Sequence, residues 1–415
     1  MRRGFLSDYF VGVGAKKLAA VDADPDSSNQ HEVTGSKPLL KILGDRDRKF
    51  LRGGDDTRFA ATYMWLGVEQ EAMTEDGYLS WYDSRRNDAT RSAEWRLYYQ
   101  SNAVTEMMLP GDTLFVARRP DDRLFFIITP DGSTTQRQLF WLFRLDDQPG
   151  LVFEPREIKK EADAELGFAA RYILDELGIE AEEPEAERLD DLIEPFGLAF
   201  PSTRVFSALA RSSLPDVSPF DDPDVALVEW MNREEQMFRR LERRIVAERI
   251  SGGFKSSEGA DVDGFLSFSL SVQNRRKARA GSALENHLEA IFEARGIRFA
   301  RGAETENRNR PDFLFPGQAE YRDPLFPSAH LTMLGSKSTL KDRWRQVLSE
   351  AARISEKHLL TLEPGISENQ TNEMRAKNLQ LVVPRKIQAT YKVSQQNWLM
   401  AVSEFLTLVI ARQRA

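Results

Sequence analysis

The stretch "LTMLGSKSTLKDRWRQVLSE", residues 331–350, joins a short apolar run to a charged segment. Lys337 ends the apolar run, and Glu350 follows thirteen residues later. A short apolar run is typical of a buried strand, and the residues after it have helical spacing. We expect a strand at 331–337 and a helix from about Thr339 to His358. The stretch is either an ordinary strand leading into a solvated helix or one wall of a site that cuts its substrate.

The chain around this stretch alternates strands and helices from about residue 192 onward. A helix is expected at 234–250, and another at 282–296 with Ser282 as N-cap and Gly296 as its stop. Further strands are expected at "RPDFLFPG" (310–317), "HLLTLEP" (358–364) and "LQLVVPR" (379–385), and a final helix at 398–414. This alternation predicts an α/β domain in which helices flank a mixed sheet.

The first 155 residues have a different pattern, typical of a mainly-β domain. Short apolar runs such as "TLFVARR" (113–119) and "LFFIITP" (124–130) lie between "PGD", "PDD" and "PDG" turn signals. Their spacing favours a compact barrel or sandwich. The acidic segment 156–191 is interpreted as a linker with a helical first half, which Pro184 would end or kink. An alternative is that its acidity mimics phosphate and occupies a basic groove. We therefore divide the chain into 1–155, 156–191 and 192–415.

Composition limits the class of protein. A chain of 415 residues suits two domains. There is no run of about 18 apolar residues and no export leader at the N-terminus, so we expect a cytoplasmic protein with no membrane partner. The absence of cysteine excludes disulfides and thiolate metal sites, and four histidines argue against structural zinc.

Net charge is −8, yet this does not argue against nucleic acid as a partner. Residues 158–191 hold twelve acidic and four basic residues, which sum to −8, so the remainder is balanced. Phosphate affinity depends on local clusters. Basic clusters occur in "SRRNDATRSAEWR" (84–96), "NRRKAR" (274–279), "RGAETENRNR" (301–310) and "KDRWR" (341–345), each of which is otherwise a solvated face.

Four residues suggest phosphodiester hydrolysis, which needs a hard cation on oxygen ligands and a lysine near the attacking water. Asp312 begins an apolar strand after proline, and Lys337 ends the next strand. The nuclease pattern PD…(D/E)xK places an acid two residues before the lysine, but Gly335 stands there. Glu350 is the candidate replacement, and Glu285 a third acid. Each acid also has a structural alternative. Asp312 would be a turn acid after proline, Glu350 a solvent-facing helix residue, and Glu285 a first-turn acid favoured by the helix dipole.

At these positions the sequence resembles the EcoRII restriction endonucleases. The resemblance lies in "NRRKARAGSALENHLEAIFEARG", "RPDFLFPG", "LTMLGSKSTLKDRWRQVLSEAARISEKHLLTLEPGIS" and "LVVP", in the family's order and spacing. It covers residue 274 to the C-terminus. A looser likeness includes "FPS" (200–202) and "YDSRRNDATR" (82–91), the latter resembling the family's N-terminal domain.

The resemblance implies a catalytic centre of Glu285, Asp312, Lys337 and Glu350, with the second acid relocated to the helix after the lysine strand. Asp312 and Glu350 would hold Mg²⁺, and Lys337 would orient or help deprotonate the attacking water. It also implies a type II site-specific deoxyribonuclease with a restriction-endonuclease-like fold. Cleavage would leave a 5′-phosphate.

The resemblance also implies how DNA is read. Lys341, Asp342 and Arg343 match the segment that relatives insert into the major groove, where such side chains bond guanine and cytosine edges. The target would be CCWGG-like with flipped central bases, and Arg233 is the candidate for the pocket. In the same pocket, Met237 occupies a position at which we expect an aromatic residue.

The N-terminal domain would be a pseudobarrel that binds a second target site and restrains the nuclease until it is occupied. The residues in the matching loop are Arg85, Arg86, Arg91 and Arg96. Partners implied are double-stranded DNA, a second copy of the chain, since palindromic sites are read by two-fold symmetric proteins, and a cognate DNA methyltransferase of the same restriction–modification system.

Two other functions remain open at this stage. One is a nuclease of the same fold that acts in DNA repair or on modified DNA, with the first domain sensing the modification. The other is a catalytically inactive DNA-binding protein. Lys337 amid carboxylates argues against the second, because a binding protein has no need of it.

Overall fold

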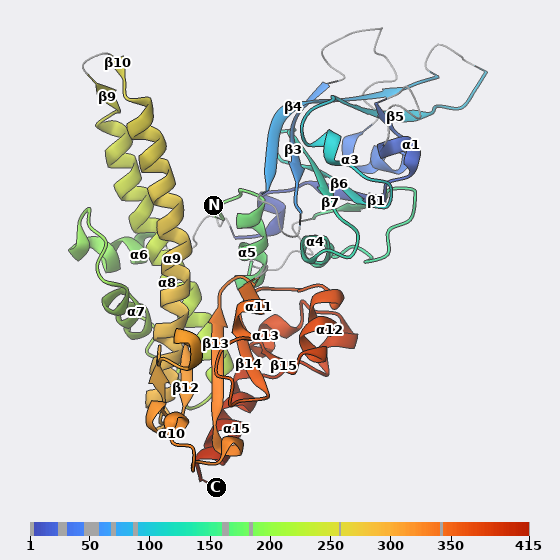
Figure 1. Ribbon diagram of the computed structural model, residues 1–415. Helices are drawn as coiled ribbons and strands as arrows, with labels where there is room; N and C mark the ends of the chain where they lie inside the picture. Colours follow the sequence, from blue (N-terminus) through green and yellow to red (C-terminus); the bar gives the residue numbers. More distant parts are fainter. Residues whose placement is uncertain are drawn as a thin grey trace. The chain divides into compact units, whose positions relative to one another are not determined.

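The structure is a computed structural model that describes residues 4–23, 31–44, 58–67, 72–85, 90–159, 166–181, 186–256, 259–340 and 343–414 (Figure 1). The chain divides into two compact units. The first is Met1–Glu182 with Gly365–Asn369, and the second is Glu183–Pro364 with Gln370–Ala415. No helix within the described ranges is both long and apolar enough to cross a membrane.

The first unit is built on one eight-stranded sheet, which confirms the mainly-β prediction. Its order is β2-β5-β4-β3-β7-β6-β1-β8, and every pairing is antiparallel except β3 with β7. The strands are β1 (Gly12–Lys17), β2 (Glu32–Val33), β3 (Arg58–Trp65), β4 (Met73–Asp83), β5 (Trp95–Tyr99), β6 (Thr113–Arg118), β7 (Leu124–Thr129) and β8 (Glu154–Glu157). The expected apolar runs at 113–119 and 124–130 are β6 and β7.

Both faces of this sheet are covered. In β7, Leu124, Phe126 and Ile128 belong to one apolar core, and the alternate residues Phe125 and Ile127 belong to another. The helices of the unit are α1 (Ala20–Ala23), α3 (Leu40–Leu43), α4 (Thr134–Phe143) and α5 (Phe168–Glu176), with short 3₁₀ turns at Leu6–Asp8, Lys37–Leu39 and Thr105–Met107.

The acidic segment 156–191 is shared between the two units. Its first half contains α5, whose Ile173 and Leu174 are buried in the core that also holds Phe125 and Ile127. Its second half contains α6 (Ala186–Ile193), whose Leu189 and Ile193 are buried in a helical core of the second unit. The division between Glu182 and Glu183 falls between these helices.

The second unit contains a five-stranded mixed sheet in the order β11-β12-β13-β14-β15, as predicted. The pairs β11–β12 and β12–β13 are antiparallel, whereas β13–β14 and β14–β15 are parallel. The strands are β11 (Ala300–Arg301), β12 (Phe313–Phe315), β13 (Thr332–Lys337), β14 (Lys357–Thr361) and β15 (Leu379–Val382).

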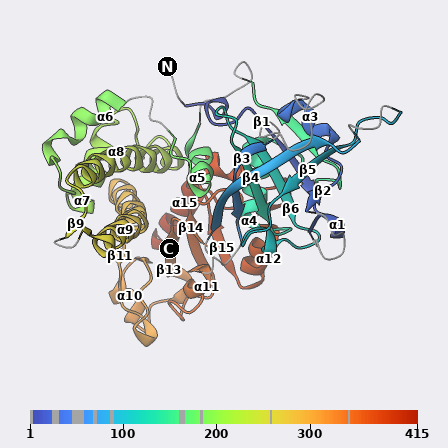
Figure 2. The same ribbon diagram turned by 90° about the horizontal axis from the view of Figure 1, so that it is seen from above.

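Helices accompany this sheet along the chain. They are α7 (Thr203–Ser212), α8 (Pro223–Ser251), α9 (Val262–Ala294), α10 (Gln318–Arg322), α11 (Trp344–Val347), α12 (Glu368–Ala376), α13 (Arg385–Gln388), α14 (Val393–Gln396) and α15 (Val402–Arg414), with 3₁₀ turns at Glu194–Phe196, Glu306–Arg308 and Ser328–His330. The helices α8 and α9 lie side by side in both views, joined at the tip by the short pair β9 (Lys255–Ser256) and β10 (Gly259–Ala260) (Figures 1 and 2).

The N-cap predicted for the helix at 282–296 is wrong. The helix begins twenty residues earlier, where the Asp261 side chain accepts a hydrogen bond from the backbone of Gly264 at 2.9 Å. A helix that packs along a neighbour continues through Ser282, because its hydrogen bonds are already made within the helix. The predicted stop is confirmed, since Gly296 has a positive φ of 64° just beyond the helix.

The long helix predicted at 339–358 is also wrong. Only α11 forms, and Ala351 has a positive φ of 48° that a continuing helix does not allow. The apolar residues at helical spacing are buried, but in a turn that leads back to the sheet. The Arg353 guanidinium holds this turn by donating to the carbonyls of Asp323 at 2.9 Å and Phe326 at 2.7 Å.

Candidate active site

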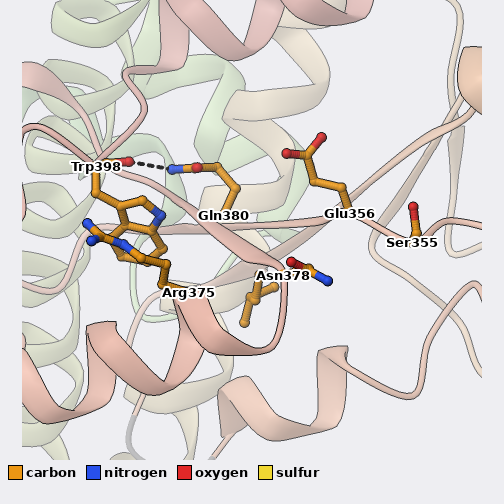
Figure 3. Close-up of a pocket in the computed structure, with 7 residues that line it drawn as sticks. Ser355, Glu356, Arg375, Asn378, Gln380 and Trp398 are labelled. Carbon is orange, nitrogen blue, oxygen red and sulfur yellow. Dashed lines mark hydrogen bonds between the residues drawn. The ribbon is translucent and has the colours of Figure 1, made fainter.

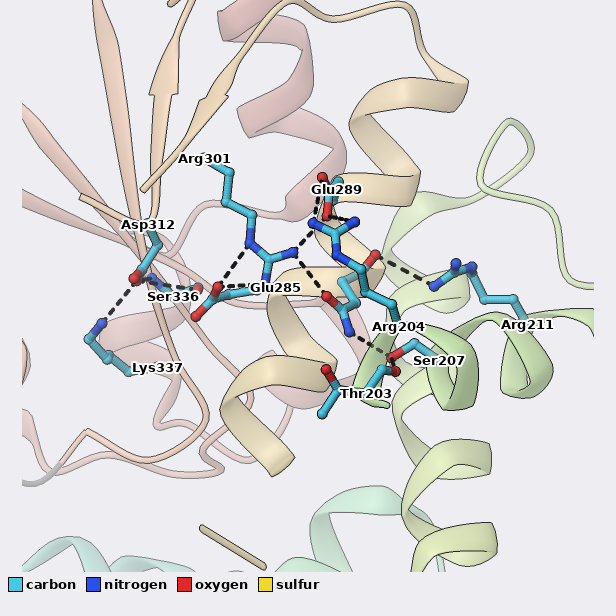
Figure 4. A network of polar contacts seen from close by, with 11 residues as sticks. Thr203, Arg204, Ser207, Arg211, Glu285, Glu289, Arg301, Asp312, Ser336 and Lys337 are labelled. Carbon is cyan, nitrogen blue, oxygen red and sulfur yellow. Dashed lines mark hydrogen bonds and ion pairs between the residues drawn. The ribbon is translucent and has the colours of Figure 1, made fainter. Parts of the chain in front are cut away.

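Two neighbouring strands bring Asp312 and Lys337 together. Asp312 stands just before β12, and Lys337 ends the antiparallel neighbour β13. The Lys337 ammonium donates to Asp312 Oδ2 at 2.9 Å, and the Ser336 backbone N–H and hydroxyl donate to the same oxygen at 2.6 and 3.3 Å (Figure 4). Among the described residues, no hydrogen bond ends on the other oxygen, Oδ1, which leaves it for a further ligand.

Glu350 comes from a different part of the chain and lies near enough to Asp312 and Lys337 for their charges to act on it. It follows α11, and its backbone N–H donates to the Val347 carbonyl at 3.2 Å. Burial and, after it, the charge of Asp312 together raise the pKa of Glu350 to about 7, against the opposing charges of Lys337 and Lys357. Its Oε2 atom is buried without a hydrogen-bond partner in the described part of the chain. A buried, unsatisfied carboxylate is costly unless a cation or proton compensates it.

The geometry explains why Gly335 stands where the nuclease pattern has an acid. A Cβ atom at this position would lie 3.0 Å from Val347 Cγ2 and 3.4 Å from Leu359 Cδ1. The space is filled by α11, so a carboxylate side chain does not fit. Glu350, three residues after Val347, is the candidate for the missing carboxylate.

Glu285 is held differently from the other three candidate residues. It lies in the last third of α9, not in a first turn as expected, and its Oε2 accepts from Arg301 Nε at 3.0 Å and Nη2 at 2.7 Å. The third guanidinium nitrogen of Arg301 binds Asn286 Oδ1 at 2.9 Å and Glu289 Oε2 at 2.6 Å (Figure 4). Arg301 lies in β11, whose neighbour Gly302 bonds the Asp312 carbonyl through its N–H at 3.0 Å.

Sequence reasoning placed Arg301 only within a basic cluster and so missed its role. A signal existed in the spacing of Glu285 and Glu289. Two carboxylates one helical turn apart repel each other unless a cation lies between them. Arg301 is that cation, and it ties α9 to the sheet edge that carries Asp312.

The donor set bears on whether a divalent cation fits. The described residues contain no group of three or more His, Asp or Glu placed to ligate one metal ion. Mg²⁺, however, takes one or two carboxylates and retains several waters. Asp312 and Glu350, whose Oε2 atom lacks a hydrogen bond in the described chain, fit that requirement.

The residues expected to read DNA bases are only partly described. Arg343 is exposed at the N-cap of α11, six residues from Lys337, while Lys341 and Asp342 lie outside the described residues. Arg233 lies in α8 and is only 8% exposed. Met237, one turn further, is fully buried in the core of α6, α7 and α8, so it presents no surface on which a base could stack.

Two of the four arginines expected in the N-terminal domain share one acidic partner. Arg85 and Arg96 both form ion pairs with Glu94, at 2.6 and 2.5 Å. Arg91 is exposed, and Arg86 lies outside the described residues. One carboxylate thus offsets part of the charge of this loop.

A separate cavity of about 390 Å³ lies in the second unit (Figure 3). It is lined by Ser355, Glu356, Arg375, Asn378, Leu379, Gln380 and Trp398. Apart from Trp398, which follows α14, these residues precede or begin β14 and β15, whereas Lys337 ends β13, which is parallel to β14. The cavity therefore lies at the opposite end of these strands from Lys337.

A mixed sheet flanked by helices, with an aspartate and a lysine at adjoining strand ends, has the architecture predicted for restriction-endonuclease-like proteins. Residues 238–406 match the family described as EcoRII C terminal. This part of the chain is thus similar to the EcoRII C-terminal family.

Individual relatives match the chain over part of their length. It is 41% identical over 216 residues to the type II restriction enzyme EcoRII of Escherichia coli, which covers 52% of either chain. It is 27% identical over 147 residues to the type II restriction enzyme SsoII of Shigella sonnei, covering 33% of this chain and 47% of that enzyme. The chain thus spans about half the length of these curated relatives.

Solved structures show a more distant likeness. Metal-depleted Ecl18kI in complex with uncleaved DNA has 19% identity and a TM-score of 0.40, over 55% of this chain and 85% of that one. A complex of the restriction endonuclease PspGI with substrate DNA has 13% identity and a TM-score of 0.43, over 52% and 94%.

Proposed function

We propose that this protein is a type II site-specific deoxyribonuclease that hydrolyses double-stranded DNA. One observation supports this most strongly. The buried Glu350 carboxylate, with an oxygen that has no partner in the described chain, lies beside the Asp312–Lys337 ion pair. The likeness to EcoRII over 216 residues supports the same activity.

Asp312 and Glu350 are the residues that would hold Mg²⁺. A bound divalent cation supplies positive charge at the scissile phosphate and lowers the pKa of water. Lys337, already within 2.9 Å of Asp312, would orient the attacking water and offset the charge that develops on phosphate. Glu285 is proposed as the additional acid, held in place by Arg301.

Recognition is proposed for residues near this centre. Lys341, Asp342 and Arg343 would read the outer base pairs of a CCWGG-like site from the major groove. Arg233 would line the pocket for a flipped base. The exposure of Arg343 next to α11 supports the first assignment, because the side chain is available to DNA.

The resemblance to the EcoRII enzymes also supports a proposal for the domains, the oligomeric state and the biological setting. Residues 1–155 would form an effector domain that binds DNA through Arg85, Arg86, Arg91 and Arg96, followed by the linker 156–191 and the catalytic domain 192–415. The protein would act as a homodimer on a two-fold site. It would work in the cytoplasm beside a cognate DNA methyltransferase.

Digestion of a sequenced plasmid with Mg²⁺, followed by mapping of the ends, tests the proposal. We expect fragments with 5′-phosphates at one short repeated sequence, none with a chelator, and none with Lys337→Ala or Asp312→Ala. Both variants should still bind the mapped duplex. Full cleavage by either variant, or binding by the wild type without cutting, would contradict the assignment.

A further inference from the structure

Residues 349–354 form a turn between α11 and β14, and Glu350 is the second residue of this turn. Within the turn, the Ile354 N–H donates to the Ala351 carbonyl at 2.9 Å. Ala351 has a positive φ of 48°, which costs a residue with a side chain about 1–3 kcal/mol. A strained turn persists only where its surroundings fix it. The contacts that reach this turn from elsewhere therefore determine where Glu350 is held.

Asn309 holds the beginning of the turn from the loop that precedes Asp312. Its Nδ2 atom donates to the carbonyl of Ser349, the residue before Glu350, at 2.8 Å. The Asn309 backbone is fixed within its own loop, because its carbonyl accepts from the Thr305 N–H at 2.8 Å. The contact thus joins the turn of Glu350 to the segment that carries Asp312, three residues further along the chain.

Lys357 holds the end of the turn from the sheet. It is only 8% exposed, and its Nζ atom donates to the Ile354 carbonyl at 2.8 Å. Alternate residues of a strand point to the same face of a sheet, so Lys357 shares a face with Leu359. Leu359 Cδ1 and Val347 Cγ2 of α11 both lie beside the Cβ position of Gly335. Lys357 is therefore on the face of the sheet that α11 covers.

The charges around the turn are consistent with these contacts. A buried ammonium is costly unless negative charge compensates it. Burial lowers the pKa of Lys357, and the charges of Glu350 and Glu306 oppose that shift. Glu306 also reaches the turn directly, since its Oε2 atom accepts from the Ala352 N–H at 3.2 Å. Side chains from two other parts of the chain thus bind the turn before and after Glu350.

We propose that Asn309 and Lys357 are positioning residues that fix the turn of Glu350 before a divalent cation binds. The inference deepens the proposed function and rests on it, because it concerns how the two acids of that centre are kept together. A cation that needs both Asp312 and Glu350 binds only the fraction of molecules in which the turn is in place. Fixing the turn in advance therefore tightens cation binding without adding a ligand.

Hydrogen exchange of the metal-free full chain tests the contacts without relying on activity. Peptides that cover residues 349–354 should exchange at least about threefold faster in Asn309→Ala and in Lys357→Met, as expected for the loss of one hydrogen bond. Lys357→Arg, which keeps a charged donor, should stay close to the wild type. The matched control is Gln318→Ala, because Gln318 Nε2 donates to the Glu304 carbonyl at 3.0 Å and does not touch the turn. Unchanged exchange in either variant would overturn the assignment of that residue.

The Mg²⁺ dependence of cleavage separates positioning from a general loss of structure. In Asn309→Ala the Mg²⁺ concentration for half-maximal single-turnover cleavage should rise at least about threefold, while the rate at saturating Mg²⁺ returns to within about twofold of the wild type. A variant that is merely less folded would cut more slowly at every Mg²⁺ concentration, with an unchanged midpoint. Lys357→Met does not suit this measurement, because the loss of a positive charge also strengthens the attraction for a cation. If Lys357→Met fails to fold, Asn309→Ala still tests the proposal.

The two measurements distinguish failure of this inference from failure of the proposed function. A wild type that cuts no DNA removes the nuclease assignment, and the inference with it, whatever the exchange rates are. A wild type that cuts with Mg²⁺, together with an Asn309→Ala variant whose Mg²⁺ midpoint is unchanged, leaves the nuclease and removes the positioning role.

Discussion

At the scale of single residues, the electrostatics of Glu350 determine how the candidate site responds to pH. Its pKa is raised to about 7, first by burial and then by Asp312. Between its ordinary pKa and pH 7 the folded protein therefore retains a proton that the unfolded chain releases. The free energy of unfolding decreases as pH rises through this range, and the cost is fully present above pH 7. A divalent cation bound at the proposed site would offset this cost.

The first prediction concerns Glu350→Gln, which keeps the shape of the side chain without its charge. The variant should be more stable than the wild type at about pH 8, by about 1–3 kcal/mol after allowance for solvent screening, and little different at about pH 5. Thermal denaturation at both pH values measures this. Millimolar Mg²⁺ should then stabilise the wild type and not the variant. An equal response of both proteins to Mg²⁺ would exclude Glu350 as a ligand.

The second prediction concerns Arg301, which lies between Glu285, Asn286 and Glu289. Arg301→Gln leaves two partly buried carboxylates one turn apart without a cation, so the free energy of unfolding should fall by about 1–3 kcal/mol. Urea denaturation measures the loss. The control is Arg298→Gln, which removes an exposed pair with Glu320 and should cost at most about 0.5 kcal/mol. Equal losses in the two variants would show that Arg301 has no special role.

At the scale of elements, the strands could be predicted from the sequence and several helix limits could not. Apolar runs bounded by turn signals gave β6, β7, β13, β14 and β15, because each has the length of a buried strand. The segment after Lys337 has helical spacing, yet Arg353 draws it into a turn by bonding three carbonyls of a distant loop. A long-range contact of this kind leaves no periodic trace in the sequence.

The part of the candidate site that lies on strands could be predicted from the sequence, because the strands themselves could be. Asp312 and Lys337 lie at strand ends, where an antiparallel register brings them together. Glu350 was predicted on a helix that does not form, and its part in the site stays a prediction. The contact of Arg301 with Glu285 depends on where β11 meets α9, which local patterns do not encode.

The third prediction tests the close approach of α11 to the sheet. Gly335→Ala should lower the free energy of unfolding by about 1–3 kcal/mol, since the new Cβ atom would meet Val347 at 3.0 Å. In a Val347→Ala background the same change should cost less than about 0.5 kcal/mol. A double-mutant cycle in urea measures the coupling. Additive losses would show that Val347 is not what excludes a side chain at this position.

At the scale of the whole molecule, the division between Glu182 and Glu183 bears on how the two units act. The α5 helix is buried in the core of the first unit, so a truncation after residue 155 would remove the sheet and expose that helix. The fourth prediction therefore uses deletion of residues 1–182. If the first unit restrains the nuclease, the truncated chain should cut a single-site plasmid without added target duplex. Continued stimulation by that duplex would contradict an effector role.

The most direct test of the proposed centre is the single-turnover cleavage rate of Glu350→Ala on a duplex that carries the mapped site. We expect the rate to fall by at least about a thousandfold, the loss typical of removing a group that stabilises the transition state, with duplex affinity retained. The control Glu356→Ala, which removes an acid paired with Arg412, should cut at the wild-type rate. Wild-type cleavage by Glu350→Ala would contradict the relocation of the acid from position 335.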